Sequence, residues 1–149
     1  MREIKFRGKP LTECNKPNGM GIAADGWAYG NLVQGDDGEA YITGDCIEST
    51  EEYFSLEWWV PVDPATVEQY TNQDDADKTE IYGGDFVMHY DCEKVFCLVD
   101  WHKNGWYLWN YLYGKWQPAR PIDWAEDYRV IGNTTDNSGM MMGGRIDGN

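Results

Sequence analysis

The chain has no apolar run close to the roughly 18 residues that a membrane-spanning helix requires. Its first seven residues alternate charged and apolar side chains, so the uninterrupted apolar stretch of a secretory signal is missing too. These two absences argue against a membrane protein and favour the cytoplasm. The composition of a disordered chain is also lacking, because 15% of the 149 residues are aromatic. We therefore expect a globular protein.

Cysteine is scarce. The four cysteines are Cys14, Cys46, Cys92 and Cys97, and no two of them form a Cys-x-x-Cys pair. This number and spacing exclude a disulfide scaffold. Because Cys92 and Cys97 are flanked by His89 and His102, a zinc site is conceivable, but Cys97 falls in an apolar strand pattern that is typical of a core residue. We predict no metal ligands and no cofactor.

Familiar catalytic motifs are absent as well. The sequence contains neither a Gly-x-Ser-x-Gly nucleophile elbow nor a phosphate-binding Gly-x-x-x-x-Gly-Lys-Ser/Thr loop. A nucleophilic mechanism would have to use His89 or His102 as its base, and both fall in or beside predicted strands, where a structural role is commoner. No catalytic residue is predicted. A metal-dependent enzyme that combines clustered carboxylates with one of these histidines stays an alternative.

Lysine and arginine are missing from residues 17–77, a stretch that holds 14 of the 26 acidic residues. The formal net charge of −14 therefore belongs to this base-free stretch, because the other 12 acids balance the 12 bases. One interpretation is a well-solvated surface that keeps the protein soluble. A second is an acidic surface that binds a basic partner, and a third is a site for a hard cation. The candidate partner-contact residues are Asp36, Asp37, Glu51, Glu52, Asp74, Asp75 and Asp77.

Aromatic residues are abundant, especially at residues 106–116. A row of aromatic side chains can stack nucleic-acid bases, but such sites also need a basic groove for the phosphates. The net charge of −14 makes direct nucleic-acid binding an unfavourable interpretation. Aromatic-rich strand edges leave a structural homo-oligomer as a further alternative.

Short alternating segments indicate a mainly β fold. Strands are predicted at residues 4–7, 27–33, 40–43, 53–60, 86–90, 95–101, 106–113 and 128–132. Pro61 ends the fourth strand, and Asn104-Gly105 is expected to form a tight hairpin turn. Asp63 and Pro64 begin one short helix, which is followed by a polar loop at residues 72–78. The pattern fits a small antiparallel architecture, which is either barrel-like or divided into two subdomains.

Four segments follow one another in a characteristic order. They are residues 1–7, residues 27–32, the linked segments 67–71 and 78–87, and residues 130–133. In this order they resemble the YopX family of phage and prophage proteins. The resemblance implies a largely β fold and a bacterial cytoplasmic setting, and it implies no activity. Its signature residues are Gly30, Tyr70, Ile81, Tyr82, Gly83, Gly84 and Asp85.

These signature residues have structural interpretations. Gly30 relieves a strand, Tyr70 and Tyr82 pack, and residues 83–85 form a turn. We expect one YopX-like domain at residues 1–133, with an alternative division near residues 71–79. A flexible tail at residues 134–149 is expected to follow, and its methionines offer a means of docking. The favoured function is a non-enzymatic interaction, in which the base-free stretch binds a basic protein of the host or the phage.

Overall fold

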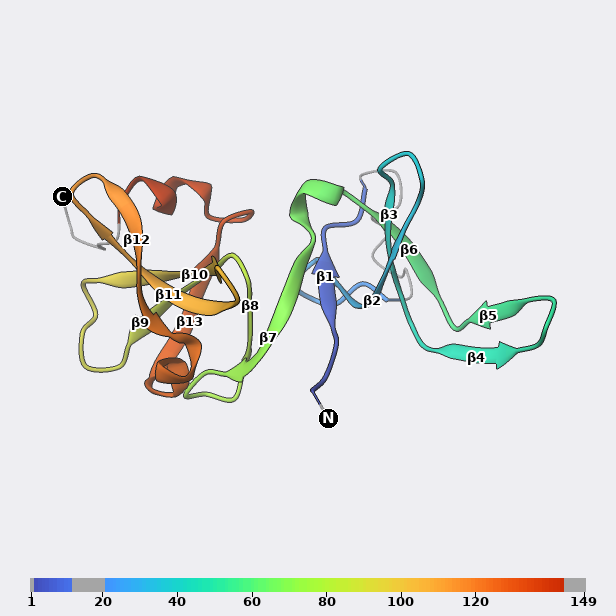
Figure 1. Ribbon diagram of the computed structural model, residues 1–149, viewed down its shortest axis with the longest axis horizontal. Coiled ribbons are helices and arrows are strands. Elements are labelled where there is room, and N and C mark those ends of the chain that lie inside the picture. Colours follow the sequence, from blue (N-terminus) through green and yellow to red (C-terminus); the bar gives the residue numbers. More distant parts are fainter. Residues whose placement is uncertain (1, 12–20, 144–149) are drawn as a thin grey trace. The chain divides into compact units, whose positions relative to one another are not determined.

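The computed structural model describes residues 2–11 and 21–143 (Figure 1). Antiparallel strands dominate, which confirms the mainly β class. Within the described ranges no sheet closes into a barrel, so the barrel-like alternative is wrong. The chain forms two compact units, Met1–Gln69 and Tyr70–Asn149. The described residues include no helix that is long and apolar enough to cross a membrane.

An antiparallel sheet forms the first unit. Strand β3 (Ala40–Thr43) lies between β6 (Trp59–Val62) and β2 (Ala28–Gln34), and β1 (Phe6–Gly8) pairs with the far side of β2. Because side chains alternate across a strand, only one face of this sheet supplies the core. The buried residues of that core are Ala28, Ala40, Ile42, Val60 and Val62.

A two-stranded hairpin, which we call the arm, connects β3 to β6. Its strands are β4 (Cys46–Ser49) and β5 (Phe54–Leu56), and Figure 1 shows them extending beyond β3 and β6. Every residue of β4 is exposed. A hairpin with so little buried surface gains little from its own packing, so its shape depends on its turn and on its attachment to the sheet.

The single strand predicted at residues 53–60 is wrong in two respects. The segment forms two strands, β5 and β6, with a break at residues 57–58. Pro61 does not end β6 but lies inside it, opposite Tyr41. Proline is tolerated here because β6 is an edge strand of its sheet, where a missing N–H leaves no ladder bond unmade.

The predicted short helix is confirmed as a 3-10 helix, η2 (Pro64–Thr66). The Asp63 side chain accepts a hydrogen bond from the backbone N–H of Ala65 at 3.0 Å, as an N-cap should. The helix ends earlier than expected, because residues from Glu68 onward form the strand β7 (Glu68–Asp74). The start of β7 pairs with β1, and its later residues pair with β8 (Glu80–Tyr82).

A five-stranded antiparallel sheet forms most of the second unit, with the strand order β12-β11-β10-β9-β13. The strands are β9 (Asp85–His89), β10 (Phe96–His102), β11 (Gly105–Leu112), β12 (Lys115–Pro121) and β13 (Tyr128–Asn133). Strand β10 is central, and its first four residues are buried. Cys97 and Val99 face one apolar cluster, and Phe96 and Leu98 face another. Both faces of β10 are therefore covered, as its two-sided apolar pattern predicted.

The hairpin predicted at Asn104-Gly105 exists, but its turn is displaced by one residue. His102 pairs with Gly105, so the two turn residues are Lys103 and Asn104. The positive φ angle, 56°, belongs to Lys103, and Gly105 already lies in β11. The Asn-Gly pair therefore predicted the hairpin correctly, but the two turn residues lie one position earlier in the chain.

Strand β12 was not predicted. It follows a second tight turn, in which Tyr113 and Gly114 have φ angles of 55° and 78°. Two positive φ angles in succession are the signature of the hairpin turn that matches strand twist. Pro118 and Pro121 weaken the strand pattern, and β12 accommodates them because it is an edge strand.

Two further 3-10 helices, η3 (Ile122–Asp127) and η4 (Ser138–Met142), were also not predicted. In η4, Met140 packs against the cluster around Phe86, and the backbone carbonyl of Met141 accepts a hydrogen bond from the Trp116 indole at 3.0 Å. Residues 144–149 lie outside the described part. The domain bounds 1–133 and the flexible tail at 134–149 therefore stay predictions.

Candidate partner-binding surface

The acids of the β2–β3 turn face solvent. Asp36, Asp37 and Glu39 are all exposed in the segment that joins the two strands. The Glu39 carboxylate accepts a hydrogen bond from the Tyr41 hydroxyl on β3. Hydrogen bonds with Glu39 and with backbone N–H groups of the turn lower the pKa of Asp37, so this carboxylate is exposed and held within the turn.

The turn of the arm presents two more acids. The Thr50 hydroxyl accepts hydrogen bonds from the backbone N–H groups of Glu52 and Tyr53, each at 3.2 Å. The Thr50 N–H in turn donates to the Tyr53 carbonyl at 2.8 Å. Because backbone groups and the threonine hydroxyl build this turn, the exposed side chains of Glu51 and Glu52 are not needed to hold it.

Asp75 differs from the other candidate contacts, because it is buried with only 4% of its surface exposed. One carboxylate oxygen accepts the N–H groups of Asp77 and Thr79, both at 2.8 Å. The other accepts the N–H of Val130 at 2.9 Å. This carboxylate ties the β7–β8 turn to β13, so we exclude Asp75 from the partner surface.

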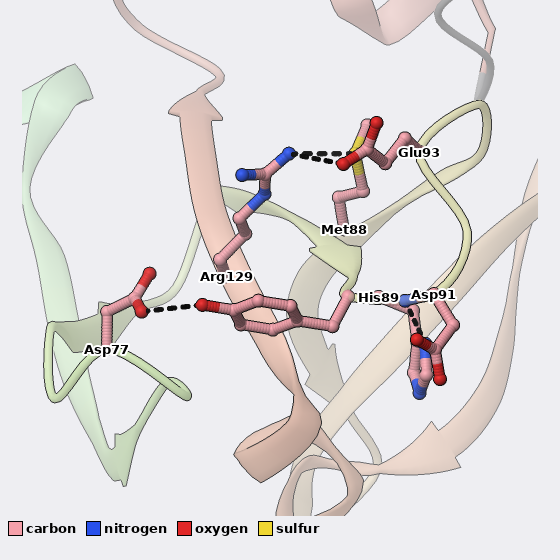
Figure 2. Close-up of polar contacts among 7 residues, drawn as sticks. Asp77, Met88, His89, Asp91, Glu93 and Arg129 are labelled. Atoms are coloured by element: carbon pink, nitrogen blue, oxygen red, sulfur yellow. Dashed lines mark hydrogen bonds and ion pairs between the residues drawn. The ribbon is translucent and has the colours of Figure 1, made fainter.

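The two neighbours of this carboxylate also have internal contacts. Asp74 accepts a hydrogen bond from the Tyr70 hydroxyl at 2.5 Å. Asp77 is exposed and accepts one from the Tyr90 hydroxyl at 3.0 Å (Figure 2). The three aspartates therefore do not form one patch, and the candidate contacts that remain are the exposed acids Asp36, Asp37, Glu51 and Glu52 of the β2–β3 turn and the arm.

An apolar groove runs along the solvent side of the first sheet. Val33 pairs with Tyr41, and Thr43 pairs with Trp59, so these four side chains share the face opposite the core. The groove, about 290 Å³ in volume, is lined by these four residues together with Phe54 and Leu56 of the arm. Val33 is 43% exposed, Phe54 64% and Trp59 60%.

The sequence patterns did not locate this groove. Its residues come from β2, β3, β5 and β6, of which β2, β3 and β6 are joined by strand pairing and β5 is contributed by the arm. A partial signal exists at residues 27–33, where the predicted strand includes Val33 of the groove. The aromatic run at residues 53–60 is another, but its division between the arm and β6 requires the tertiary structure.

Among the signature residues, Gly30 permits a close approach of backbone segments. A Cβ atom at this position would lie 2.2 Å from the carbonyl oxygen of Thr43. No side chain fits at that distance. Gly30 therefore allows β2 to pack against the end of β3, which carries one of the residues of the groove.

The remaining signature residues organise the start of the second unit. The Asp85 carboxylate accepts the backbone N–H of Tyr82 at 2.8 Å across the Gly83-Gly84 turn, and Gly84 has a φ of 85°. The rings of Tyr70 and Tyr82 lie 5.6 Å apart. Ile81 is fully buried in the cluster around Val99, and Gly83 is buried too.

The two histidines contact aromatic rings. The ring of His89 lies 5.0 Å from that of Tyr128, and its Nδ1 accepts the N–H of Asp91 at 3.0 Å (Figure 2). The ring of His102 lies 5.4 Å from that of Tyr107 and 5.5 Å from that of Trp109, edge to face in both cases. Beside His89, Figure 2 shows the Arg129 guanidinium directed at Glu93 and Met88.

The cysteines have contrasting surroundings. Cys97 is buried, and burial raises the pKa of its thiol to about 11. Cys46 and Cys92 are exposed, and Cys14 lies outside the described residues. Across residues 2–11 and 21–143, no group of three or more His, Cys, Asp or Glu side chains is arranged to hold a metal ion.

Comparison with known proteins gives a family and a fold. The family model described as YopX protein matches residues 25–142. No curated protein matches the chain. The crystal structure of protein EF1440 from Enterococcus faecalis is similar over 95% of this chain and 99% of that chain, with 14% identity and a TM-score of 0.55. At that identity the likeness shows the fold alone.

Proposed function

The chain belongs to the YopX family, and we propose that it is a non-enzymatic interaction protein that binds a basic protein through the acidic surface of its first unit. The base-free stretch carries the argument, because it places exposed acids on the β2–β3 turn and along the arm. The family resemblance supports a phage or prophage origin and the cytoplasm of a bacterial host. In that setting the basic partner is a protein of the host or of the phage.

The exposed apolar side chains of the arm favour binding over solubility alone. Ile47 is 65% exposed, and Phe54 and Tyr53 are exposed on the same hairpin. A surface that serves only to keep a protein in solution needs carboxylates and gains nothing from bare apolar groups. Apolar side chains interspersed with acids match the composition of a surface that is covered by a partner.

Electrostatic complementarity gives such a surface its selectivity. Acids without intervening bases attract a basic protein over distances of about 10 Å at ordinary ionic strength and repel acidic ones. Since the turn of the arm does not depend on the side chains of Glu51 and Glu52, evolution or mutagenesis can change these charges without unfolding the arm.

Charge reversal tests the proposal. The binding variant carries Asp36→Lys, Asp37→Lys, Glu51→Lys and Glu52→Lys. The control variant makes the same change in charge at exposed acids of the second unit, with Asp91→Lys, Asp123→Lys, Glu126→Lys and Asp127→Lys. Both are used as bait in lysate of the bacterial host, and retained proteins are identified by mass spectrometry.

We expect a basic protein to be retained by the natural chain and by the control variant, to be lost with the binding variant, and to dissociate between about 0.05 and 0.5 M salt. Equal retention by both variants, or retention that does not change with salt, would overturn the proposal. So would the absence of any specifically retained protein.

Two alternatives stay hypotheses. A metal-dependent enzyme built on carboxylates and a histidine is not favoured by the aromatic contacts of His89 and His102. A structural homo-oligomer predicts a concentration-dependent mass in solution, which light scattering measures directly.

A further inference from the structure

We infer that the apolar groove of the first unit is the docking site for a short basic protein segment, in which one or two large apolar side chains are flanked by lysine or arginine. This inference rests on the proposed function and specifies its partner. The apolar side chains would enter the groove, and the flanking cations would meet the acids around it.

The floor of the groove is rigid. Val33, Tyr41, Thr43 and Trp59 project from paired strands whose other face is packed in the core. The rings of Tyr41 and Trp59 meet edge to face, with centroids 5.8 Å apart. A preformed floor lowers the cost of ordering when a partner binds.

The wall of the groove comes from the arm. Phe54 and Leu56 are two residues apart on β5 and therefore point to the same side of the hairpin. The groove is shallow and open to solvent, and its volume of about 290 Å³ is at the lower limit of the roughly 300–1,000 Å³ of typical small-molecule sites. This size suits one or two amino-acid side chains.

Two acids lie beside these apolar side chains. Glu39 accepts the hydroxyl of Tyr41, which lines the floor. Glu57 directly follows Leu56, and its carboxylate accepts the N–H of Asp45 at 3.3 Å. Glu48 is not one of them, because it pairs with Ser55 and so lies on the other side of the hairpin from Phe54 and Leu56, where it accepts the hydroxyl of Tyr53 at 2.8 Å. A cation that follows an apolar anchor into the groove would meet the carboxylates of Glu39 and Glu57.

The nearby base does not cancel this field. Lys5 lines a neighbouring polar hollow together with Asp45 and Glu57. Its ammonium group forms an ion pair with Glu3 at 3.4 Å. The base-free stretch itself, which supplies all six residues of the groove, contains no lysine or arginine.

Charge selects the class of occupant. A nucleic acid, an acidic peptide or an anionic lipid would bring negative charge against these carboxylates. A neutral apolar segment would fill the groove but would leave the surrounding acids without partners. A basic segment with apolar anchors satisfies both features, and the acids add to its rate of association.

Defined peptides test the inference. The probe is fluorescein-labelled Lys-Lys-Leu-Leu-Lys-Lys amide, and its binding is measured by fluorescence anisotropy and by amide chemical shifts of the natural chain. Matched probes replace both leucines by phenylalanine, by isoleucine or by serine. The serine probe has the same charge and no apolar anchor.

Two variants separate the groove from general surface apolarity. The groove variant is Phe54→Ser with Trp59→Thr, and both positions are exposed enough that folding should survive. The control variant is Tyr113→Asn with Trp124→Ser, which removes two exposed aromatic residues from the second unit. Circular dichroism and urea unfolding establish that both variants fold.

We expect at least one apolar probe to bind the natural chain tenfold or more tightly than the serine probe. The groove variant should remove that advantage, and the control variant should keep it within twofold. Chemical shift changes should centre on residues 33, 41, 43, 54, 56 and 59 of the natural chain, a readout that does not depend on any variant.

Different failures have different meanings. If all probes, including serine, bind equally and lose affinity with salt, the groove inference is overturned and the acidic surface stands. If apolar probes bind the groove regardless of salt and of the Asp36, Asp37, Glu51 and Glu52 reversals, the acidic surface fails and so does the basic character of the occupant. A dimer that dissociates in the groove variant would overturn the inference in favour of a second copy of the chain.

Discussion

Asp37 in the β2–β3 turn and Asp75 after β7 come from the same base-free stretch, yet their surroundings are opposite. Asp37 is exposed, whereas Asp75 is buried and accepts three backbone N–H groups. The same contrast separates the arm from the segment around β9 and β10. In one region aromatic and acidic side chains face water, and in the other the same residue types are enclosed. Residue type therefore says little about role until burial is known.

The largest expected effect is a difference between two phenylalanines. Phe86 is fully buried, with its ring 5.3 Å from that of Phe96, while Phe54 lies on the arm. We expect Phe86→Ala to lower the free energy of unfolding by about 3–5 kcal/mol, because it leaves a cavity. Phe54→Ala should cost less than about 1 kcal/mol. Urea unfolding measures both, and equal losses would show that the arm is part of the folded core.

The two aspartates give the next largest difference. Asp75→Asn should lower the free energy of unfolding by about 2–3 kcal/mol, because an amide cannot accept hydrogen bonds at both of its atoms and one backbone N–H loses its partner. Asp37→Asn should change it by no more than about 0.5 kcal/mol. The same urea experiment applies. A stable Asp75→Asn protein would contradict the structural role that its three contacts indicate.

Two cysteines extend the contrast to reactivity. Burial raises the pKa of Cys97 to about 11 from 9.0, so the thiolate fraction at pH 8 falls about 100-fold. Cys46 lies exposed on the arm. We expect iodoacetamide to label Cys46 quickly and Cys97 at least about 100-fold more slowly, as followed by mass spectrometry of peptides. Comparable rates under native conditions would mean that β10 opens readily.

The smallest expected effect is a change in the pH dependence of stability, which two tyrosines test. Burial is the main cause that raises the pKa of Tyr128, whereas a hydrogen bond to Glu48 is the main cause for Tyr53. In both cases the folded state holds its proton more tightly than the unfolded state. The stabilisation is therefore complete below the unfolded pKa of about 10 and is lost as the pH rises above it.

Urea unfolding between pH 8 and pH 11 measures this loss for Tyr128→Phe and Tyr53→Phe. We expect Tyr128→Phe to flatten the alkaline decline in stability. The matched Tyr53→Phe should have a smaller effect, because water screens an exposed hydrogen bond. In the Glu48→Gln variant, absorbance at 295 nm should show earlier ionisation of Tyr53 only. If Glu48→Gln shifts no tyrosine, the assigned cause is wrong.

Local sequence patterns predicted the elements whose signals lie within a few neighbouring residues. An apolar strand pattern identified β10, and Asp63 with Pro64 identified the start of η2. Pro61 misled, because proline is tolerated inside a strand at the edge of a sheet, and β6, like β12 with its Pro118, is an edge strand. Whether a strand is at an edge depends on its neighbours, which no local window contains.

The candidate surface also has a part that the sequence predicted and a part that it did not. The exposed acids of the β2–β3 turn and the arm were predicted, because the absence of bases is a property of the sequence itself. Asp75 was placed with them, since nothing in its local sequence shows that the N–H of Val130 lies 2.9 Å away. That hydrogen bond joins residues 55 positions apart.

The sequence by itself determined the mainly β class and the position of the negative charge, because composition and alternation are additive along the chain, and its ordered segments carried the resemblance to the family. Only the tertiary structure decided which acids are structural and where apolar side chains form a groove. Val33, Phe54 and Trp59 become neighbours through the pairing of β2, β3 and β6 and the return of the arm. Proximity of that kind follows from the register of distant strands, so the acidic stretch became a candidate binding surface only once its sheet was folded.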